Sequence, residues 1–298
     1  MYFTQDKITE IFYITDEFCT EFQKSIQGHL LGKTAKKKPK MAHSEIITIL
    51  IIFHGMQHKN LKHFYLHYVQ KHLTHLFPNT VSYNRFVELS QQVVLPMTLF
   101  LKMQCLGDCT GITYVDSTSI RVCKNKRIKS NKVFKGIATV GKSTMGWFYG
   151  FKLHLIVNEK GDVLNFIITQ GNVDDRNPLN DSKFLEKIKG KLYADKGYIS
   201  AKLTQLLFVD GVQLITGIRD KMKNCLLELK DKILLRKRSV IETINDELKN
   251  ICQVEHSRHR CFQNFIANLI SGLITYSFFP KKPAIKFDVE STNQLAIY

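Results

Sequence analysis

Apolar side chains recur every three or four positions through the first hundred residues, which is typical of helices with one buried face. The stretch 6–26 (DKITEIFYITDEFCTEFQKSI) shows this spacing clearly. Further helices are predicted over 43–53 (HSEIITILIIF), where Ser44 is placed to act as the N-cap, and over 62–77 (KHFYLHYVQKHLTHLF). A short helix is predicted after the Pro-Asn turn, capped by a Thr or Ser. We therefore expect a helical N-terminal region.

The pattern changes near residue 110, where β-branched and aromatic residues gather in short runs. A strand is predicted in 111–123 (GITYVDSTSIRVC), followed by two strand-like runs joined by the turn NEKGD. Helix and strand then alternate, and the predicted elements are a helix over 178–190, a strand over 191–195, a helix over 200–211, a strand over 212–219 and a helical pattern over 232–279. A strand meander followed by alternating elements predicts a mixed sheet flanked by helices, in the α+β or α/β class.

The charge balance indicates a polyanionic partner. The chain of 298 residues has 43 Lys and Arg against 26 Asp and Glu, which gives a formal charge of +17 at pH 7. An excess of this size favours binding to nucleic acid, because phosphates attract clustered cations. Composition leaves open the alternative of a basic soluble protein without such a partner.

The cysteines and the apolar runs bear on the compartment. There are seven cysteines, an odd number without a CxxC pair, which predicts neither a disulfide framework nor a zinc ribbon. Reduced thiols in a cytoplasm are the simplest account. The first residues lack the segments of a signal peptide, and the longest apolar runs are too short to span a bilayer. We therefore expect a cytoplasmic protein with no membrane partner.

Three carboxylates stand apart from the ordinary surface charge. Asp116 lies inside an apolar strand pattern, Asp195 ends the strand KLYAD, and Glu242 lies in the helical stretch RKRSVIETINDELKNI. Three-and-four spacing places Arg238 and Lys249 on the same helical face as Glu242, beside the apolar stripe. We expect this face to point toward the ends of the central strands.

Two strand aspartates and one helix glutamate, brought together by the fold, suit a hard divalent cation. Mg²⁺ prefers oxygen ligands and takes one or two carboxylates per ion. Two such ions about 4 Å apart stabilise both the attacking and the leaving oxygen of a phosphoryl displacement. Position alone leaves open three unrelated structural acids, namely a turn Asp, a capping Asp and a helix-surface Glu.

The segments that contain these acids resemble a known family. In order along the chain they are YVDSTSIRVC, TQGNVDDRNPL, KLYADKGYIS, LITGIRDKMKN and LLRKRSVIETINDELKN. They are similar to the DDE transposases of bacterial insertion sequences, and most of all to the insertion-sequence family numbered nine-eight-two. The resemblance extends over nearly the whole chain and includes the N-terminal SEIITILIIF and FPNTVSYNRFVEL.

The resemblance implies a ribonuclease H-like core that binds Mg²⁺ or Mn²⁺, as two ions. Asp116 matches the family's acid on the first strand, Asp195 the acid after the fourth strand, and Glu242 the acid on a later helix. It also implies action on double-stranded DNA, at terminal inverted repeats and at target DNA. The expected assembly is a homodimer or higher multimer.

One part of the family pattern is incomplete. The wider superfamily surrounds its glutamate with Tyr-x₂-Arg-x₃-Glu-x₆-Lys. Arg238 and Lys249 match this pattern and are candidates for contacts to DNA phosphates, whereas Leu235 stands at the Tyr position. A phosphate contact assigned to that Tyr therefore does not carry over.

Further cations extend the candidate DNA surface. The segment 121–135 (RVCKNKRIKSNKVFK) has seven basic residues and lies between two predicted strands. A solvated loop is the alternative to contact with the DNA backbone, which we favour for Arg121, Lys124, Lys126 and Arg127. The short helix carrying Arg85 near its N-terminus either enters a major groove or packs as an ordinary helix.

Three other residues have alternatives that the sequence leaves open. Asp174 and Asp175, in GNVDDR, are predicted as turn or N-cap residues rather than as the second acid. Trp147 is predicted to pack in the core or on the sheet surface, with stacking on a DNA base as the alternative.

These observations predict a two-part protein. Residues 1–105 form a helical region for DNA binding and dimerisation, 106–280 a ribonuclease H-like DDE catalytic domain, and 281–298 a C-terminal tail. The expected function is transposition, in which a phosphodiester is cleaved at the element end and the released 3′-hydroxyl attacks target DNA, in the cytoplasm with the bacterial nucleoid. A nuclease that does not join DNA and a transposase-derived DNA-binding protein without catalysis are the alternatives.

Overall fold

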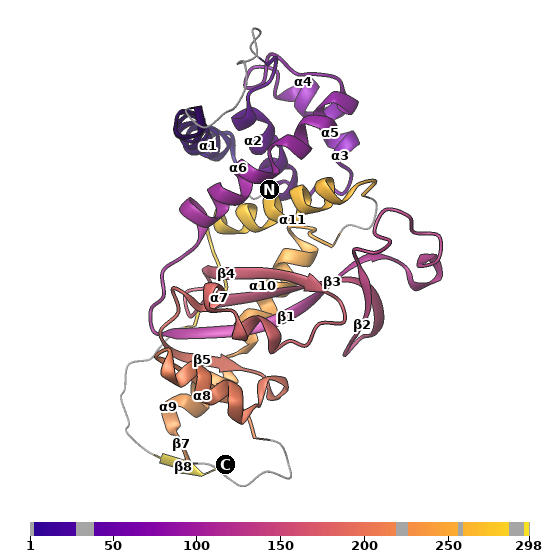
Figure 1. Ribbon diagram of the computed structural model, residues 1–298. Coiled ribbons are helices and arrows are strands. Elements are labelled where there is room, and N and C mark those ends of the chain that lie inside the picture. The colour runs from indigo at the N-terminus through magenta and orange to yellow at the C-terminus, as the bar shows by residue number, and fades with distance from the viewer. Residues whose placement is uncertain (1–2, 28–38, 219–225, 256–258, 286–294, 298) are drawn as a thin grey trace. The chain divides into compact units, whose positions relative to one another are not determined.

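The computed structural model describes residues 3–27, 39–218, 226–255, 259–285 and 295–297. The chain forms two compact units, a helical one (1–105 and 248–280) and one that contains the β-sheet (106–247 and 281–298) (Figure 1). The sequence placed 248–280 with the sheet, whereas the structure places this segment with the N-terminal helices. Most of the predicted tail, 286–294 and 298, lies outside the described residues.

The helical unit contains one long helix and several shorter ones. Its elements are α1 (Gln5–Gln27), α2 (His43–Gly55), α3 (Leu61–His63), the π-helical η1 (Phe64–Val69), α4 (Gln70–His72), α5 (Tyr83–Gln92), α6 (Val94–Phe100), the π-helical η2 (Leu101–Cys105) and α11 (Phe262–Ser277). The helix predicted over 62–77 is present but ends at His72. As predicted, the short helix α5 begins at a cap, since the Ser82 hydroxyl accepts a hydrogen bond from the backbone N–H of Arg85.

Helices α2 and α11 are apolar on every side and form the core of this unit. Thr275 on α11 donates a hydrogen bond to the carbonyl of Ile51 on α2, and His54 Nε2 lies 2.9 Å from Ser271 Oγ. A helix that is hydrophobic all round needs partners on all sides. This requirement explains why α11 packs with the N-terminal helices. Ser44 is not the N-cap of α2, because the helix begins at His43 and the Ser44 hydroxyl instead donates to Asp16.

The sheet unit has a mixed sheet whose strand order is β4–β3–β1–β5–β6, with β2 also paired to β3. Its strands are β1 (Ile112–Cys123), β2 (Thr139–Ser143), β3 (Gly146–Asn158), β4 (Val163–Gln170), β5 (Gly190–Ala194) and β6 (Val212–Thr216). Strands β1, β3 and β4 form the predicted antiparallel meander, and β5 and β6 run parallel to β1. This is the expected ribonuclease H-like arrangement. Strand β2 was not predicted, because the run TVGKS is short and contains a glycine.

Helices lie on both faces of the sheet. The helices and helical turns of this unit are η3 (Asn125–Arg127), η4 (Asn177–Asn180), α7 (Ser182–Leu185), η5 (Lys196–Tyr198), α8 (Ala201–Val209), α9 (Leu229–Arg236) and α10 (Ser239–Asn250), and a small second sheet pairs β7 (Leu226–Glu228) with β8 (Leu295–Ile297). The helix predicted over 178–190 is much shorter than expected, because Asp181 caps a separate turn and Gly190 already belongs to β5. No helix in the described ranges has the length and apolar character needed to cross a bilayer.

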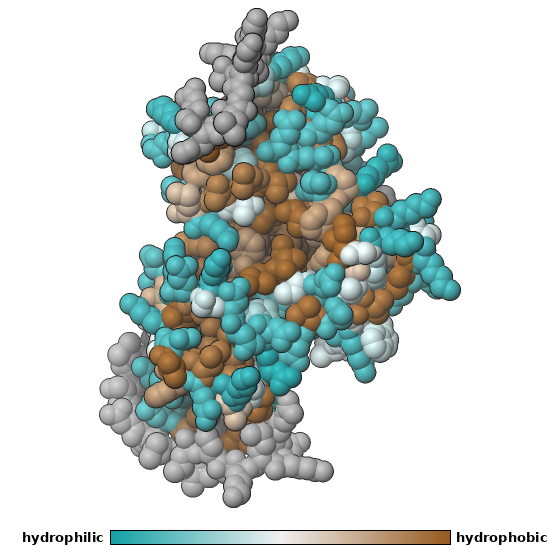
Figure 2. All heavy atoms as spheres, viewed as in Figure 1, coloured by the Kyte–Doolittle hydropathy of each residue, from teal (hydrophilic) through white to brown (hydrophobic). Residues whose placement is uncertain are grey.

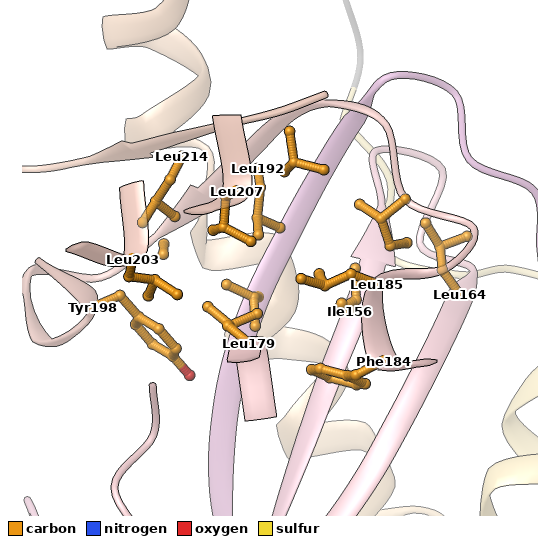
Figure 3. Packing of buried hydrophobic residues seen from close by; sticks show 14 residues of the cluster. Ile156, Leu164, Leu179, Phe184, Leu185, Leu192, Tyr198, Leu203, Leu207 and Leu214 are labelled. Carbon is orange, nitrogen blue, oxygen red and sulfur yellow. The ribbon is translucent and has the colours of Figure 1, made fainter. Parts of the chain in front are cut away.

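The two faces of the sheet carry different side chains. One face is a cluster in which Val115, Leu192 and Leu214 of the strands pack with helix α8, through Leu203 and Leu207 (Figure 3). On the opposite face the Tyr114 hydroxyl donates to the carbonyl of Leu234 on α9. Because side chains alternate along a strand, Asp116 lies on the face of α9 and α10, and Ser117 lies on the face of α8.

Candidate active site

Asp116 lies in the middle of β1, the central strand of the sheet, opposite Leu155 of β3. Its Oδ2 accepts a hydrogen bond of 3.2 Å from the side-chain amide of Asn245 on α10. The pKa of Asp116 is raised from 3.8 to about 6, mainly by burial and to a smaller extent by the nearby charges of Glu242 and Asp195, against the lowering effect of Arg238. A carboxylate that is costly to ionise yet surrounded by other acids is typical of a functional site.

Asp195 follows β5 directly, as the sequence predicted, and precedes the turn η5. Its side chain makes no capping hydrogen bond to that turn and is 56% exposed. The alternative of a purely capping aspartate therefore has no support. The turn is anchored by Tyr198, which is buried beside Leu203 in the apolar cluster (Figure 3).

Glu242 lies in the first turn of α10 and meets Arg238, which stands in the short break between α9 and α10. Arg238 Nη2 donates to Glu242 Oε1 at 2.6 Å and lies 3.8 Å from Asp195 Oδ1. Because both distances start at the same nitrogen, the separation of Glu242 Oε1 and Asp195 Oδ1 cannot exceed their sum. The break between the helices was not predicted, but the expected i, i+4 pairing across it is present.

The structure thus brings Asp116, Asp195 and Glu242 together around Arg238. One guanidinium faces three carboxylates, so the site keeps a negative charge at neutral pH that attracts cations. Among the described residues no three His, Cys, Asp or Glu side chains are arranged as a metal-ligand set. Two of the acids instead turn toward the guanidinium of Arg238, which balances part of their charge.

Asn245 is the site residue that sequence reasoning did not single out. It is 7% exposed, and its Oδ1 is buried without a hydrogen-bond partner among the described residues. An orphaned buried oxygen beside a carboxylate is an additional donor of the kind that Mg²⁺ prefers. The available signal was its position three residues after Glu242, on the same helical face.

The predicted DNA-contacting residues fall in both units. In the sheet unit, Arg121 is half-buried on β1, whereas the cations of the following loop are exposed, among them Lys124, Lys126 and Arg127. In the helical unit, Arg85 is exposed on α5 and pairs with Glu88. Lys249 lies near the end of α10, seven residues after Glu242, and is 3.8 Å from Glu255.

Asp174 and Asp175 do not join the three acids. Asp174 accepts two hydrogen bonds from the Arg176 guanidinium and one from its backbone N–H, and these bonds lower the pKa of Asp174 to about 2. Asp175 accepts hydrogen bonds from Ser117 and Lys152. Since Ser117 and Asp116 point to opposite faces of β1, this second pair of acids lies behind the sheet rather than at the site.

Comparison with known proteins gives two findings and one absence. A family model described as the transposase DDE domain matches residues 106–262. A solved structure, the cryo-EM synaptic complex of piggyBac transposase with hairpin DNA, is similar over 93% of this chain and 73% of that chain, with a TM-score of 0.46 and 11% identity. No curated protein matches the sequence. Because the family model covers more than half of the chain and includes all three acids, the protein belongs to the transposase DDE domain family.

Proposed function

We propose that this protein is the transposase of an insertion sequence of the nine-eight-two family, which cleaves the element ends and joins them to target DNA. The observation that carries the proposal is the convergence of Asp116, Asp195 and Glu242 around Arg238. The acids come from two neighbouring parallel strands and from a helix over the same sheet. Such a set, in a chain of this family, supports phosphoryl transfer on DNA.

The three carboxylates would hold Mg²⁺ or Mn²⁺, as two ions, with Asn245 as an additional oxygen donor. The residues present fit such ions, because every donor is a hard oxygen and the site is negatively charged. When bound, the ions supply activation of the attacking oxygen and stabilisation of the leaving oxygen.

The protein's own residues then have separate tasks. Asp116 is ionised at neutral pH, since its pKa is about 6, and Asn245 fixes its orientation. Arg238 balances the charge of Asp195 and Glu242 before a cation arrives. The planar set of donors on the Arg238 guanidinium would also suit a DNA phosphate.

The proposed partner is double-stranded DNA, at the element's terminal inverted repeats and at the target. The net charge of +17 supports this partner, and the proposed contacts are Arg121, Lys124, Lys126, Arg127, Arg238, Lys249 and Arg85. A homodimer or higher multimer would bring two element ends together. The proposed place of action is the bacterial nucleoid.

A strand-transfer assay on labelled inverted-repeat DNA tests this function. The repeats are found in the DNA that flanks the gene. We expect cleaved ends and joined products, both dependent on Mg²⁺ or Mn²⁺. Cleavage without joined product would indicate a nuclease, and binding without any cleavage would indicate a DNA-binding protein that lacks catalysis.

The pH dependence of cleavage provides a second test. Because the ligand form of Asp116 is the ionised one and its pKa is about 6, we expect cleavage to fall as pH decreases through about 6. Bound cation competes with the proton, so a higher Mg²⁺ concentration should move this acid limb to lower pH. Single-turnover cleavage of preformed complexes, measured over pH at two Mg²⁺ concentrations, gives the limb. An acid limb that lies at the same pH for both Mg²⁺ concentrations would contradict the role given to Asp116.

A further inference from the structure

Strand β2 and the first residues of β3 form a ribbon only two strands wide. The ribbon pairs Thr139–Ser143 with Gly146–Gly150 and closes in a two-residue turn at 144–145. On its other edge β3 pairs with β1 only from Tyr149 onward. In the described structure, the pairs from Gly141 to the turn therefore have no third strand, and the ribbon projects past the end of β1 (Figure 1).

The two faces of this ribbon differ sharply. On the inner face Phe148 is fully buried, and a side chain on Gly141 would clash with the backbone carbonyl of Gly171. On the outer face the cross-strand pair Lys142 and Trp147 is exposed, and Trp147 is 61% accessible although it is the only tryptophan of the chain. Lys142 Nζ lies 5.7 Å from the Trp147 ring centroid. Trp147 is thus on the sheet surface and not in the core.

The ribbon is surrounded by positive charge. The chain from 117 to 158 contains no Asp or Glu, and the exposed cations beside the ribbon are Lys124, Lys126, Arg127, Lys129, Lys132 and Lys135. Asn125 donates a hydrogen bond to the Trp147 carbonyl, which ties the basic loop to the ribbon. In Figure 2 hydrophilic side chains lie at the outer rim of this projecting edge, next to apolar ones.

We propose that this ribbon, residues 139–150, enters the major groove of the DNA bound at the active site, with Lys142 and Trp147 facing the bases. The major groove accepts a two-stranded ribbon, and apolar side chains there contact thymine methyl groups. The loop cations lie where they neutralise the flanking phosphates. The inference rests on the proposed function. It adds to that function the element that grips the duplex several base pairs from the phosphodiester that is cleaved.

The position of the ribbon fits a duplex that ends at the acids. Asp116 pairs with Leu155, and alternation along β3 places Leu155 and Trp147 on the same face of the sheet. The eight residue steps from Trp147 to Leu155 span about 26 Å of extended chain. This length corresponds to about eight base pairs of B-DNA, less than one helical turn.

Charge decides between DNA and a protein partner. A second copy of this chain carries the same excess of cations and would bring like charges together at the ribbon. An exposed tryptophan beside a lysine and a basic loop instead matches an anionic polymer that offers both phosphates and the apolar methyl groups of thymine. The occupant is therefore duplex DNA, and an acidic protein is the rival outcome of the test.

The only tryptophan makes the test direct, because the full-length protein then reports on Trp147 alone. Acrylamide quenching of its fluorescence is measured with and without a labelled duplex about three helical turns long. Binding itself is followed by the anisotropy of the label. We expect the quenching constant to fall roughly threefold in the complex, since interface burial excludes the quencher. Trp147→Ala should weaken binding about tenfold, because the apolar contact with base edges in the groove is lost.

Two further variants sharpen the outcome. Lys126→Gln, which removes one of the loop cations assigned to the phosphates, should lower the slope of log affinity against log salt by about one. Phe208→Ala, which removes an aromatic side chain 71% exposed on α8, is the matched control and should leave affinity unchanged. Circular dichroism checks that each variant is folded.

The outcomes separate the inference from the function on which it rests. Tight duplex binding with an unprotected Trp147 and an unaffected Trp147→Ala variant would overturn the ribbon's role but leave the proposed function intact. Failure of the wild-type protein to bind any duplex would overturn both. Protection of Trp147 by polyglutamate but not by DNA would assign the surface to an acidic protein.

Discussion

Asp116→Asn is expected to abolish metal-dependent cleavage and, at the same time, to stabilise the metal-free protein. The raised pKa of Asp116 means that the folded state pays for ionising this group at neutral pH. Replacement by a neutral amide removes that cost, worth up to about 3 kcal/mol for a pKa raised from 3.8 to about 6. A metal ligand is lost in the same step, so cleavage should fall at least a hundredfold, more than loss of an outer-shell partner costs.

The gain in stability should depend on pH. The pKa of Asp116 is higher in the folded state than in the unfolded state. The stability that a protonated Asp116 gives the wild type is therefore fully present below the unfolded value of 3.8 and is lost as pH rises through about 6. The difference in melting temperature between variant and wild type should therefore be several degrees at neutral pH and vanish near pH 4. Thermal unfolding in a chelating buffer measures it.

Three matched variants define the specificity of this result. Asp195→Asn and Glu242→Gln should also abolish cleavage while DNA binding persists, but without the gain in stability, since both side chains are more than half exposed and pair with Arg238. Asp210→Asn removes an exposed charge at the end of α8 and should change neither property. Normal turnover in any one of the three acid variants would remove that residue from the site.

Arg238→Ala should shift the pH dependence of cleavage as well as lower its rate. The guanidinium holds the pKa of Asp116 down against burial, so its removal should raise that pKa above about 6. The acid limb of the pH–rate profile should then move to higher pH. Arg238→Lys should return the acid limb close to its wild-type pH but recover less of the cleavage rate. The reason is that an ammonium supplies the charge without the planar set of donors.

Arg236→Ala is the control for this experiment. Arg236 is an exposed cation at the end of α9, two residues before Arg238. Its replacement should leave the acid limb in place. If Arg238→Ala lowers the rate but leaves the limb unmoved, the guanidinium acts on a DNA phosphate alone and not on the acids.

Local patterns predicted most of the elements that carry the site. The strands around Asp116 and Asp195 have the residue types of central strands, and the apolar stripe of Ile241 and Ile244 on α10 is buried as expected. These are properties of short windows of sequence. Other features depend on tertiary contacts. The role of Asn245 needs Asp116, which lies far away in the chain, and β2 is a strand only because β3 pairs with it.

The discontinuous helical unit has a consequence for the order of synthesis. The apolar helix α2 ends at Gly55, and its partner α11 begins only at Phe262. At the usual rate of translation, roughly 10–40 s pass between the synthesis of α2 and the synthesis of α11. The sheet unit between them has all of its central strands before then. The nascent chain therefore carries an apolar helix that α1 covers on one side only throughout the folding of its catalytic half, and premature termination would leave the α11 side of that helix permanently exposed.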